Sequence, residues 1–386
     1  MRILLALAAI LSSLTLVPSL GAQAPPQANA AVPAAQVRWP APTLTSPTVV
    51  QVPTTGLDRT FGATEDVLLD LPAQPVTGQV STTGGDDIRI VGGQIGDGAT
   101  FDGTYGIEAR NLRGSLYIEG VLIDFSQVVD KDNIVATGYS PCRTSRAGWA
   151  YPEVYVQNSR LLGSKYSGGA MHPDLVQKQG AMGSFFSHNV TGESSYQGYQ
   201  LSATSFSSDC PGNAPQEAHT EGLKNQDRLT PGETIISNTN LRHRADHASG
   251  YLAWLTWDAG AHGSFHGEDP WPTTLESFWV QGRPQGDHKL CCNLLWPRTL
   301  TPLAENGADV KMTLSADKRS ATWEPGAQIR GTAWEGDPPD GDFSPVGMAG
   351  MTYTPRDIER AGDAPDPDRD PGAAPSSTPT PTPGPT

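Results

Sequence analysis

One pattern recurs in IRIVGGQIGD (residues 88–97), LYIEGVLIDF (116–125) and VYVQNSRLLG (154–163). Each segment has a short strand of alternating apolar residues, then a Gly or an Asn, then a second short apolar strand. Gly and Asn adopt the left-handed backbone conformation more readily than other residues, so they favour tight corners between strands. The predicted corner residues, including three from later segments of the same kind, are Gly92, Gly120, Asn158, Asn189, Asn238 and Gly282.

A second series of short strands alternates with the first. It consists of GIEAR from Gly106, NIVATG from Asn133, HPDLVQKQ from His172, TEGLKNQ from Thr220 and GYLAWLTW from Gly250. A unit of two or three strands that cannot bury its own apolar face, and that recurs about every 20–50 residues, is typical of a solenoid. Helix periodicity is nearly absent between residues 60 and 300. We therefore predict an all-β chain that forms a β-solenoid, with a β-sandwich or jelly roll as the alternative.

The chain resembles the right-handed parallel β-helix proteins of the pectate-lyase-like superfamily over residues 80–300. The most specific part of the resemblance is MHPDLVQ (171–177), which is similar to the H-x-D-x-x-Q motif in bacterial carbohydrate-associated β-helices. The resemblance implies a right-handed parallel β-helix and a function connected with polysaccharide. It supplies neither the calcium-binding aspartates and catalytic arginine of pectate lyases nor the aspartate pairs of polygalacturonases. Calcium is thus compatible with the chain but not indicated, and the identity of any metal is open.

Composition divides the chain into five parts. Residues 1–24 have an Arg, an apolar run and an Ala-Gln-Ala end, which predicts a cleaved signal peptide and a secreted or cell-surface protein. We expect a Pro/Ala-rich linker over 25–60 and the β-helix over 61–300. Residues 301–355 are expected to add C-terminal strands or a cap, because terminal repeats need covering. Residues 356–386 are expected to form a disordered Pro/Thr-rich tail, because alternating Pro, Thr and Asp cannot bury a core.

Charge and cysteine content limit the partners. The formal net charge is −15, from 41 acidic and 26 basic residues, which argues against binding to nucleic acid. No stretch beyond the signal peptide approaches the length of a membrane span, and we expect a monomer. The four cysteines suit one or two disulfides, and their order leaves three connectivities open. They are Cys142, Cys210, Cys291 and Cys292.

Two similar polar strings suggest where chemistry takes place. His172, Asp174 and Gln177 are followed 47 residues later by residues of similar kind. If the two strings lie on successive strands, they stack about 4.8 Å apart. We predict the catalytic residues to be His172, Asp174, His219, Glu221 and Lys224. We predict the substrate-binding residues to be Gln177, Arg242, His243, Arg244, His247 and Trp271, whereas Trp254 and Trp279 are expected to fill the core.

Such a patch suits cleavage of a polysaccharide. A lyase needs a cation to neutralise a uronate and a base to remove a proton, whereas a hydrolase needs two carboxyl groups, here Asp174 and Glu221. His172 and Asp174 can equally serve as structural residues that bond to exposed backbone groups at a corner. The sequence thus leaves two functions open: a polysaccharide lyase or glycoside hydrolase, and a non-catalytic β-helix that binds glycans or forms part of the cell surface.

Overall fold

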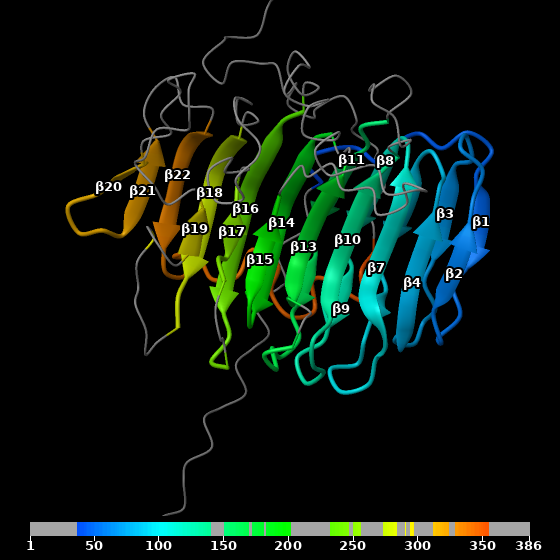
Figure 1. Ribbon diagram of the computed structural model, residues 1–386, viewed down its shortest axis with the longest axis horizontal. Coiled ribbons are helices and arrows are strands. Elements are labelled where there is room, and N and C mark those ends of the chain that lie inside the picture. Colours follow the sequence, from blue (N-terminus) through cyan, green and yellow to red (C-terminus); the bar gives the residue numbers. More distant parts are fainter. Residues whose placement is uncertain are drawn as a thin grey trace, which may run out of the picture. The chain divides into compact units, whose positions relative to one another are not determined.

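A computed structural model describes residues 37–139, 150–169, 172–180, 183–201, 232–246, 250–255, 273–283, 290, 294–296, 312–323 and 329–354. These residues form β-strands, turns and loops, with no α-helix (Figure 1). No helix among them is long and apolar enough to cross a membrane. The predicted signal peptide, the C-terminal tail and all four cysteines lie outside the described residues.

Most strands belong to two long sheets. The larger, sheet A, runs in the order β1 (Thr48–Gln51), β3 (Val67–Asp70), β5 (Ile88–Val91), β8 (Ser115–Glu119), β11 (Glu153–Gln157), β14 (Phe185–Ser194), β16 (Thr234–His243), β18 (Thr273–Gln281), β22 (Ile329–Glu335), β21 (Ser320–Trp323) and β20 (Met312–Leu314). The other, sheet B, runs in the order β19 (Leu295–Trp296), β17 (Ala253–Trp254), β15 (Gln197–Gln200), β13 (Asp174–Gly180), β10 (Asp132–Gly138), β7 (Asp102–Leu112), β4 (Gly78–Thr83) and β2 (Leu57–Thr60).

The chain alternates between these sheets. Each pass adds one strand to sheet A and one to sheet B, and neighbouring strands pair in parallel up to β22. Three short strands, β6 (Gln94–Ile95), β9 (Leu122–Asp124) and β12 (Arg160–Leu162), pair with one another after the sheet A corner. The predicted all-β parallel architecture is thus confirmed, and it is compatible with a β-helix or solenoid. Among the described strands, the antiparallel pairs are β20 with β21 and β21 with β22, at the end of sheet A.

The sheet A corner explains the recurring Gly and Asn residues. Asn158, Asn189 and Asn238 have φ values of 50°, 51° and 42°, and Gly92 and Gly120 both have φ of 67°. The asparagine side chains also bond to one another, since Asn189 Nδ2 donates to Asn158 Oδ1 at 3.0 Å and Asn238 Nδ2 to Asn189 Oδ1 at 3.2 Å. We call these three residues the asparagine ladder.

The prediction that Gly282 is the last corner residue is wrong. The pairing of β16 with β18 sets Ser237 against Glu276 and Thr239 against Phe278, so Asn238 lies beside Ser277. Ser277 has φ of 53° and takes the corner position. The sequence favoured Gly282 because serine seldom adopts positive φ.

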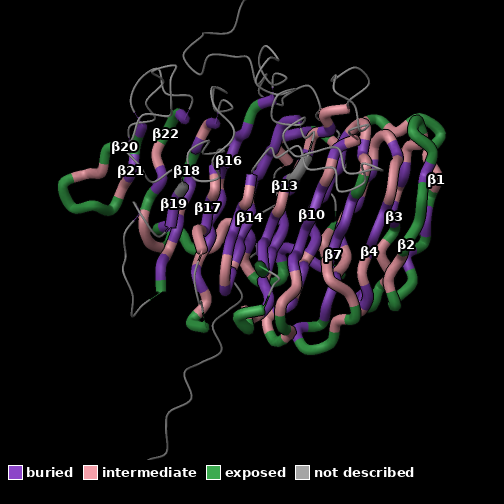
Figure 2. Tube along the Cα trace, viewed as in Figure 1, coloured by how far each residue is buried: buried purple, intermediate pink, exposed green. Residues whose placement is uncertain are grey.

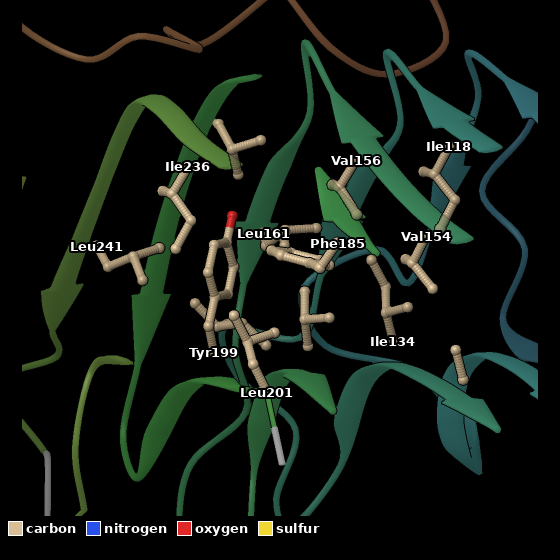
Figure 3. Packing of buried hydrophobic residues seen from close by; sticks show 14 of the residues in the cluster. Ile118, Ile134, Val154, Val156, Leu161, Phe185, Tyr199, Leu201, Ile236 and Leu241 are labelled. Atoms are coloured by element: carbon tan, nitrogen blue, oxygen red, sulfur yellow. The ribbon is translucent and has the colours of Figure 1, made fainter. Parts of the chain in front are cut away.

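The core lies between the sheets. On sheet B the core consists of alternate residues of each strand. Examples are Ile107, Ile134 and Val176, which are buried and share one register position on neighbouring strands. Figure 3 shows how Tyr199 of β15 and Phe185 of β14 pack among these aliphatic side chains. The Tyr199 hydroxyl lies 2.8 Å from Ser187 Oγ, which satisfies its hydrogen-bonding need inside the core. Figure 2 shows that burial follows the strands and that exposed residues gather in the turns.

The paired region begins earlier than composition suggested. Strands β1 and β2 lie inside the expected linker (25–60), yet β1 pairs with β3 and β2 pairs with β4. Strands β20, β21 and β22 lie within 301–355, where C-terminal strands were expected. Beyond β22, the chain runs back along earlier strands: Asp342 contacts Arg160, and the Tyr353 hydroxyl donates to Glu119 Oε1 at 2.6 Å.

Candidate functional site

The predicted site residues that the structure describes lie on or beside two strands. His172 precedes β13, which carries Asp174 and Gln177. Arg242 and His243 end β16, and Arg244 follows them. The other predicted residues, which are His219, Glu221, Lys224, His247 and Trp271, lie outside the described residues. The predicted stacking of two similar strings thus stays a prediction.

Three rings gather at the turn that leads into sheet B. The His172 ring is exposed and stacks on Tyr196, with ring centres 4.6 Å apart and an interplanar angle of 15°. The Tyr166 ring lies 4.7 Å from Tyr196 and is tilted by 51°. Tyr166 and Tyr196 are half-buried. Tyr166 and His172 come from one pass of the chain and Tyr196 from the next, so parallel stacking of the turns brings them together. We call these residues the ring cluster.

Two buried carboxyl groups lie on the strands that follow this turn. Ile134 pairs with Val176, so Asp132 and Asp174, two residues earlier in each strand, share a register position. The Asp174 amide donates to Asp132 Oδ1 at 2.7 Å. The side chains are 2% and 1% exposed, respectively, which keeps both out of contact with solvent. We call Asp132 and Asp174 the carboxyl pair. Gln197 of β15 lies beside Asp174 in the same register position.

Burial alters the acidity of this pair. It raises the pKa of Asp132 to about 7, although the hydrogen bond from the Asp174 amide lowers it. Burial also raises the pKa of Asp174 well above its usual range, and the neighbouring Asp132 raises it further. Neither Asp174 carboxyl oxygen has a hydrogen-bond partner among the described residues. A carboxyl group in this environment is protonated near neutral pH and can donate a proton.

A column of polar and aromatic side chains follows on the outer face of sheet B. Val176, Tyr199 and Ala253 belong to the core, so the next residue of each strand points to the opposite face. These next residues are Gln177, Gln200 and Trp254, which pair in register. Gln177 Nε2 donates to Gln200 Oε1 at 2.5 Å. We call these three residues the sheet B column.

The two tryptophans expected in the core lie elsewhere. Trp254 belongs to the sheet B column and is half-buried. Trp279 stacks on Trp334, with ring centres 5.8 Å apart, and Trp334 is 41% exposed. Both expectations were wrong because the apolar strands alternate, and each tryptophan occupies an outward position between core residues such as Phe278 and Val280.

The arginines near the end of β16 have protein partners. Arg242 forms an ion pair with Asp342 and lies 3.6 Å from Asp337 and 3.8 Å from Glu193. Arg244 donates to the Ser126 carbonyl at 2.8 Å and to the Gly163 carbonyl at 3.0 Å, and it pairs with Asp246.

These contacts account for both positive charges without a ligand. His243 is 8% exposed and pairs in register with Ser194.

Sequence reasoning missed several residues that the site uses. Asp132 had a detectable signal, because DNIVATG (132–138) and DLVQKQG (174–180) both begin with Asp and pair in register. Tyr166 and Tyr196 had no detectable signal in the sequence, since their contact depends on the lengths of the turns. Lys178 was also missed: it is fully buried on β13, and its Nζ donates to the Gly183 carbonyl at 2.8 Å. Burial lowers the pKa of Lys178 well below its usual range.

The described part of the chain contains no group of three His, Cys, Asp or Glu side chains that could hold a metal ion. Comparison with family models, with curated proteins and with solved structures found no match to this chain. Among the described residues, the ring cluster, the carboxyl pair and the sheet B column together offer rings, titratable groups and amides to a ligand.

Proposed function

We propose that the chain is an exported right-handed parallel β-helix protein of the pectate-lyase-like kind that binds extracellular polysaccharide at sheet B. The observation that carries this proposal is the exposed His172 ring stacked on Tyr196 at the turn into sheet B. Flat rings at a surface bind the apolar faces of sugars, and their polar edges bind hydroxyl groups. The motif around His172, which carries the family resemblance, supplies one of these rings.

The sheet B column supports the same proposal. Amide side chains both donate and accept hydrogen bonds, which suits the hydroxyl groups of a sugar. Gln177, Gln200 and Trp254 come from three successive strands, about 4.8 Å apart. A regular row of this kind suits a polymer whose units also repeat along a line. The acidic net charge favours a neutral glycan over a strongly anionic one.

A second candidate function is cleavage of the bound glycan, and the carboxyl pair favours it. A carboxyl group with a pKa of about 7, such as Asp132, can protonate a glycosidic oxygen near neutral pH. Two carboxyl groups suit hydrolysis better than elimination. Against this, both groups are buried, so cleavage requires a movement that exposes them. For this reason binding is the primary proposal.

Affinity electrophoresis in gels that contain neutral or uronate polysaccharides tests the proposal. We expect the wild-type chain to be retarded by at least one neutral polysaccharide, and Tyr196→Ala to lose most of the retardation. The matched control is Trp334→Ala, which removes an exposed ring far along sheet A and should leave the retardation unchanged. Equal retardation of wild type and Tyr196→Ala, or none on any polymer, would overturn the proposal.

The same samples separate binding from cleavage. New reducing ends that appear with wild type and are absent with Asp132→Asn indicate hydrolysis. Reducing ends accompanied by the ultraviolet absorbance of unsaturated sugars indicate elimination instead. Retardation with no new ends supports binding alone.

A further inference from the structure

The residues before the first strand lie on the outer face of sheet A. Trp39 is only 8% exposed, although it belongs to no strand. Its ring packs against Phe186, with ring centres 5.0 Å apart, and against Tyr155 at 6.3 Å. The His188 ring meets it edge-on at 6.1 Å. With Ile235, these side chains form a small apolar cluster that is separate from the core.

The backbone of this segment is bound mainly by the Gln157 side chain, and the Tyr117 hydroxyl also donates to the Trp39 carbonyl at 3.3 Å. Gln157 Oε1 accepts hydrogen bonds from the amides of Arg38 and Trp39, both at 3.0 Å. Gln157 Nε2 donates to the Trp39 carbonyl at 2.9 Å. The amide of Gln157, which is fully buried, thus binds the backbone of both residues, and its Nε2 also donates to the Tyr117 hydroxyl at 3.2 Å. Such contacts bind a peptide chain through groups that every residue has.

Side-chain contacts add selectivity at both positions. The Arg38 guanidinium forms an ion pair with Glu276, in which Nη2 donates to Oε1 at 3.2 Å. The Trp39 ring lies on the aromatic side chains of β11 and β14. Glu276 is on β18, so the segment contacts strands from three passes of the chain, which are β11, β14 and β18. We call Tyr155, Gln157, Phe186, His188 and Glu276 the Trp39-binding surface.

We propose that the Trp39-binding surface is a peptide-binding site for a segment in which a basic residue precedes tryptophan, and that Arg38 and Trp39 are its resident ligand. Three observations together support this: an amide that binds two consecutive peptide groups, an aromatic surface for one side chain, and a carboxylate for the other. A segment that merely covered a face would need no such matched set. This proposal does not depend on the polysaccharide proposal, because it concerns the opposite sheet.

Tethering predicts how the site behaves. Residues 40–47 connect Trp39 to β1, and a short tether gives the resident segment an effective concentration on the order of millimolar. A free peptide therefore competes poorly with the wild-type segment. It should bind well once the resident side chains are removed.

The test uses the full chain and a fluorescent peptide with the sequence of residues 36–42, QVRWPAP. Fluorescence anisotropy should show saturable binding to the double variant Arg38→Ala/Trp39→Ala and at least tenfold weaker binding to wild type. Adding Gln157→Ala to the double variant should weaken binding by about tenfold or more, since three hydrogen bonds are lost. A peptide with Ala in place of Trp is the matched control and should not bind. Equal binding of the peptide to wild type and to a folded double variant would overturn the proposal.

A second measurement applies if the double variant fails to fold. In the wild-type chain, hydrogen exchange of the Arg38 and Trp39 amides should be slow, because Gln157 accepts from both. Gln157→Ala should speed exchange at these two amides by about tenfold or more, while amides of β13 keep their rates. Unchanged exchange at Arg38 and Trp39 would also overturn the proposal.

Discussion

The outer face of sheet A and the turn that leads into sheet B both gather aromatic rings from successive passes of the chain. On sheet A, Tyr155 and Phe186 lie under Trp39, which the chain itself supplies. At the turn into sheet B, His172 stacks on Tyr196 and remains exposed. Parallel register therefore creates aromatic surfaces in both places, and only one of them is covered by a bound segment of the chain.

The glutamine side chains of the two regions also have different hydrogen-bond partners. Gln157 on sheet A has its amide bound to the peptide groups of Arg38 and Trp39. Gln177 on sheet B bonds to Gln200, another outward side chain of the same column. The Gln157 amide is therefore occupied by a segment of the chain itself, whereas a pair of side-chain amides at a half-exposed face can exchange partners with a ligand from outside. This difference distinguishes an occupied surface on sheet A from an open one on sheet B.

The largest effect is expected from removing the ring that covers sheet A. Trp39→Ala should lower the free energy of unfolding by about 3–5 kcal/mol, the usual cost of deleting a buried tryptophan side chain. Urea denaturation followed by circular dichroism measures this. Trp334→Ala, which removes a 41% exposed ring, is the control and should cost less than about 1 kcal/mol. Similar costs for both variants would mean that Trp39 does not hold the sheet A face.

The carboxyl pair should make the sheet B side sensitive to rising pH. The pKa of Asp132 is about 7 in the folded chain and near 3.8 when unfolded. The folded state therefore keeps a proton that the unfolded state loses, and stability falls as pH rises from about 4 to 7. The loss is on the order of 4 kcal/mol at this site. Asp132→Asn should flatten this dependence in denaturation curves collected from pH 4 to 8.

An exposed carboxyl on the neighbouring strand gives the control for this dependence. Asp102→Asn should leave the loss of stability intact, because Asp102 begins β7 at the surface. If Asp132→Asn and wild type lose stability in parallel as pH rises, the carboxyl pair is not protonated in the folded chain.

On sheet A the pH dependence should have the opposite sign. Burial, with Arg38 nearby, lowers the pKa of His188 to about 4, from 6.5 in the unfolded chain. The unfolded state therefore gains a proton first as the pH falls, and stability is lost between about pH 6.5 and 4. The expected loss is about 3 kcal/mol. His188→Gln should remove it, whereas His172→Gln, at the exposed ring cluster, should not. A similar effect of both substitutions on the pH profile would contradict the distinction between the two faces.

The sequence predicted the parts of the molecule that repeat. Corner residues such as Asn158, Asn189 and Asn238 were identifiable because a positive φ restricts the residue type. The alternating strands were identifiable because each buries one face. Ser277 was missed because an uncommon residue fills a position that only the pairing of β16 with β18 reveals.

The candidate site was less predictable because it depends on contacts between turns of unequal length. His172 and Asp174 were identified together, yet the structure separates their environments: one is exposed and the other is buried beside Asp132. Residues two apart on a strand share a face, but His172 lies in the turn before β13 and Asp174 is the first residue of that strand, so strand alternation does not relate the two. Trp39 gave no signal, because its position in a Pro-rich segment indicated a linker and its contacts, from Tyr117 onward, lie far along the chain.

The smallest effect tests how far the regularity of sheet A extends. Ser277→Asn places at the last corner the residue type that the three preceding corners use. Asparagine tolerates the φ of 53° better than serine, and its amide can bond to Asn238 as Asn238 bonds to Asn189. Stability should rise by about 1 kcal/mol, which a shift of the urea midpoint measures. Ser277→Ala has neither advantage and should give no gain. If both variants lose stability, the corner at β18 differs from the asparagine ladder, and the regular part of sheet A ends at β16.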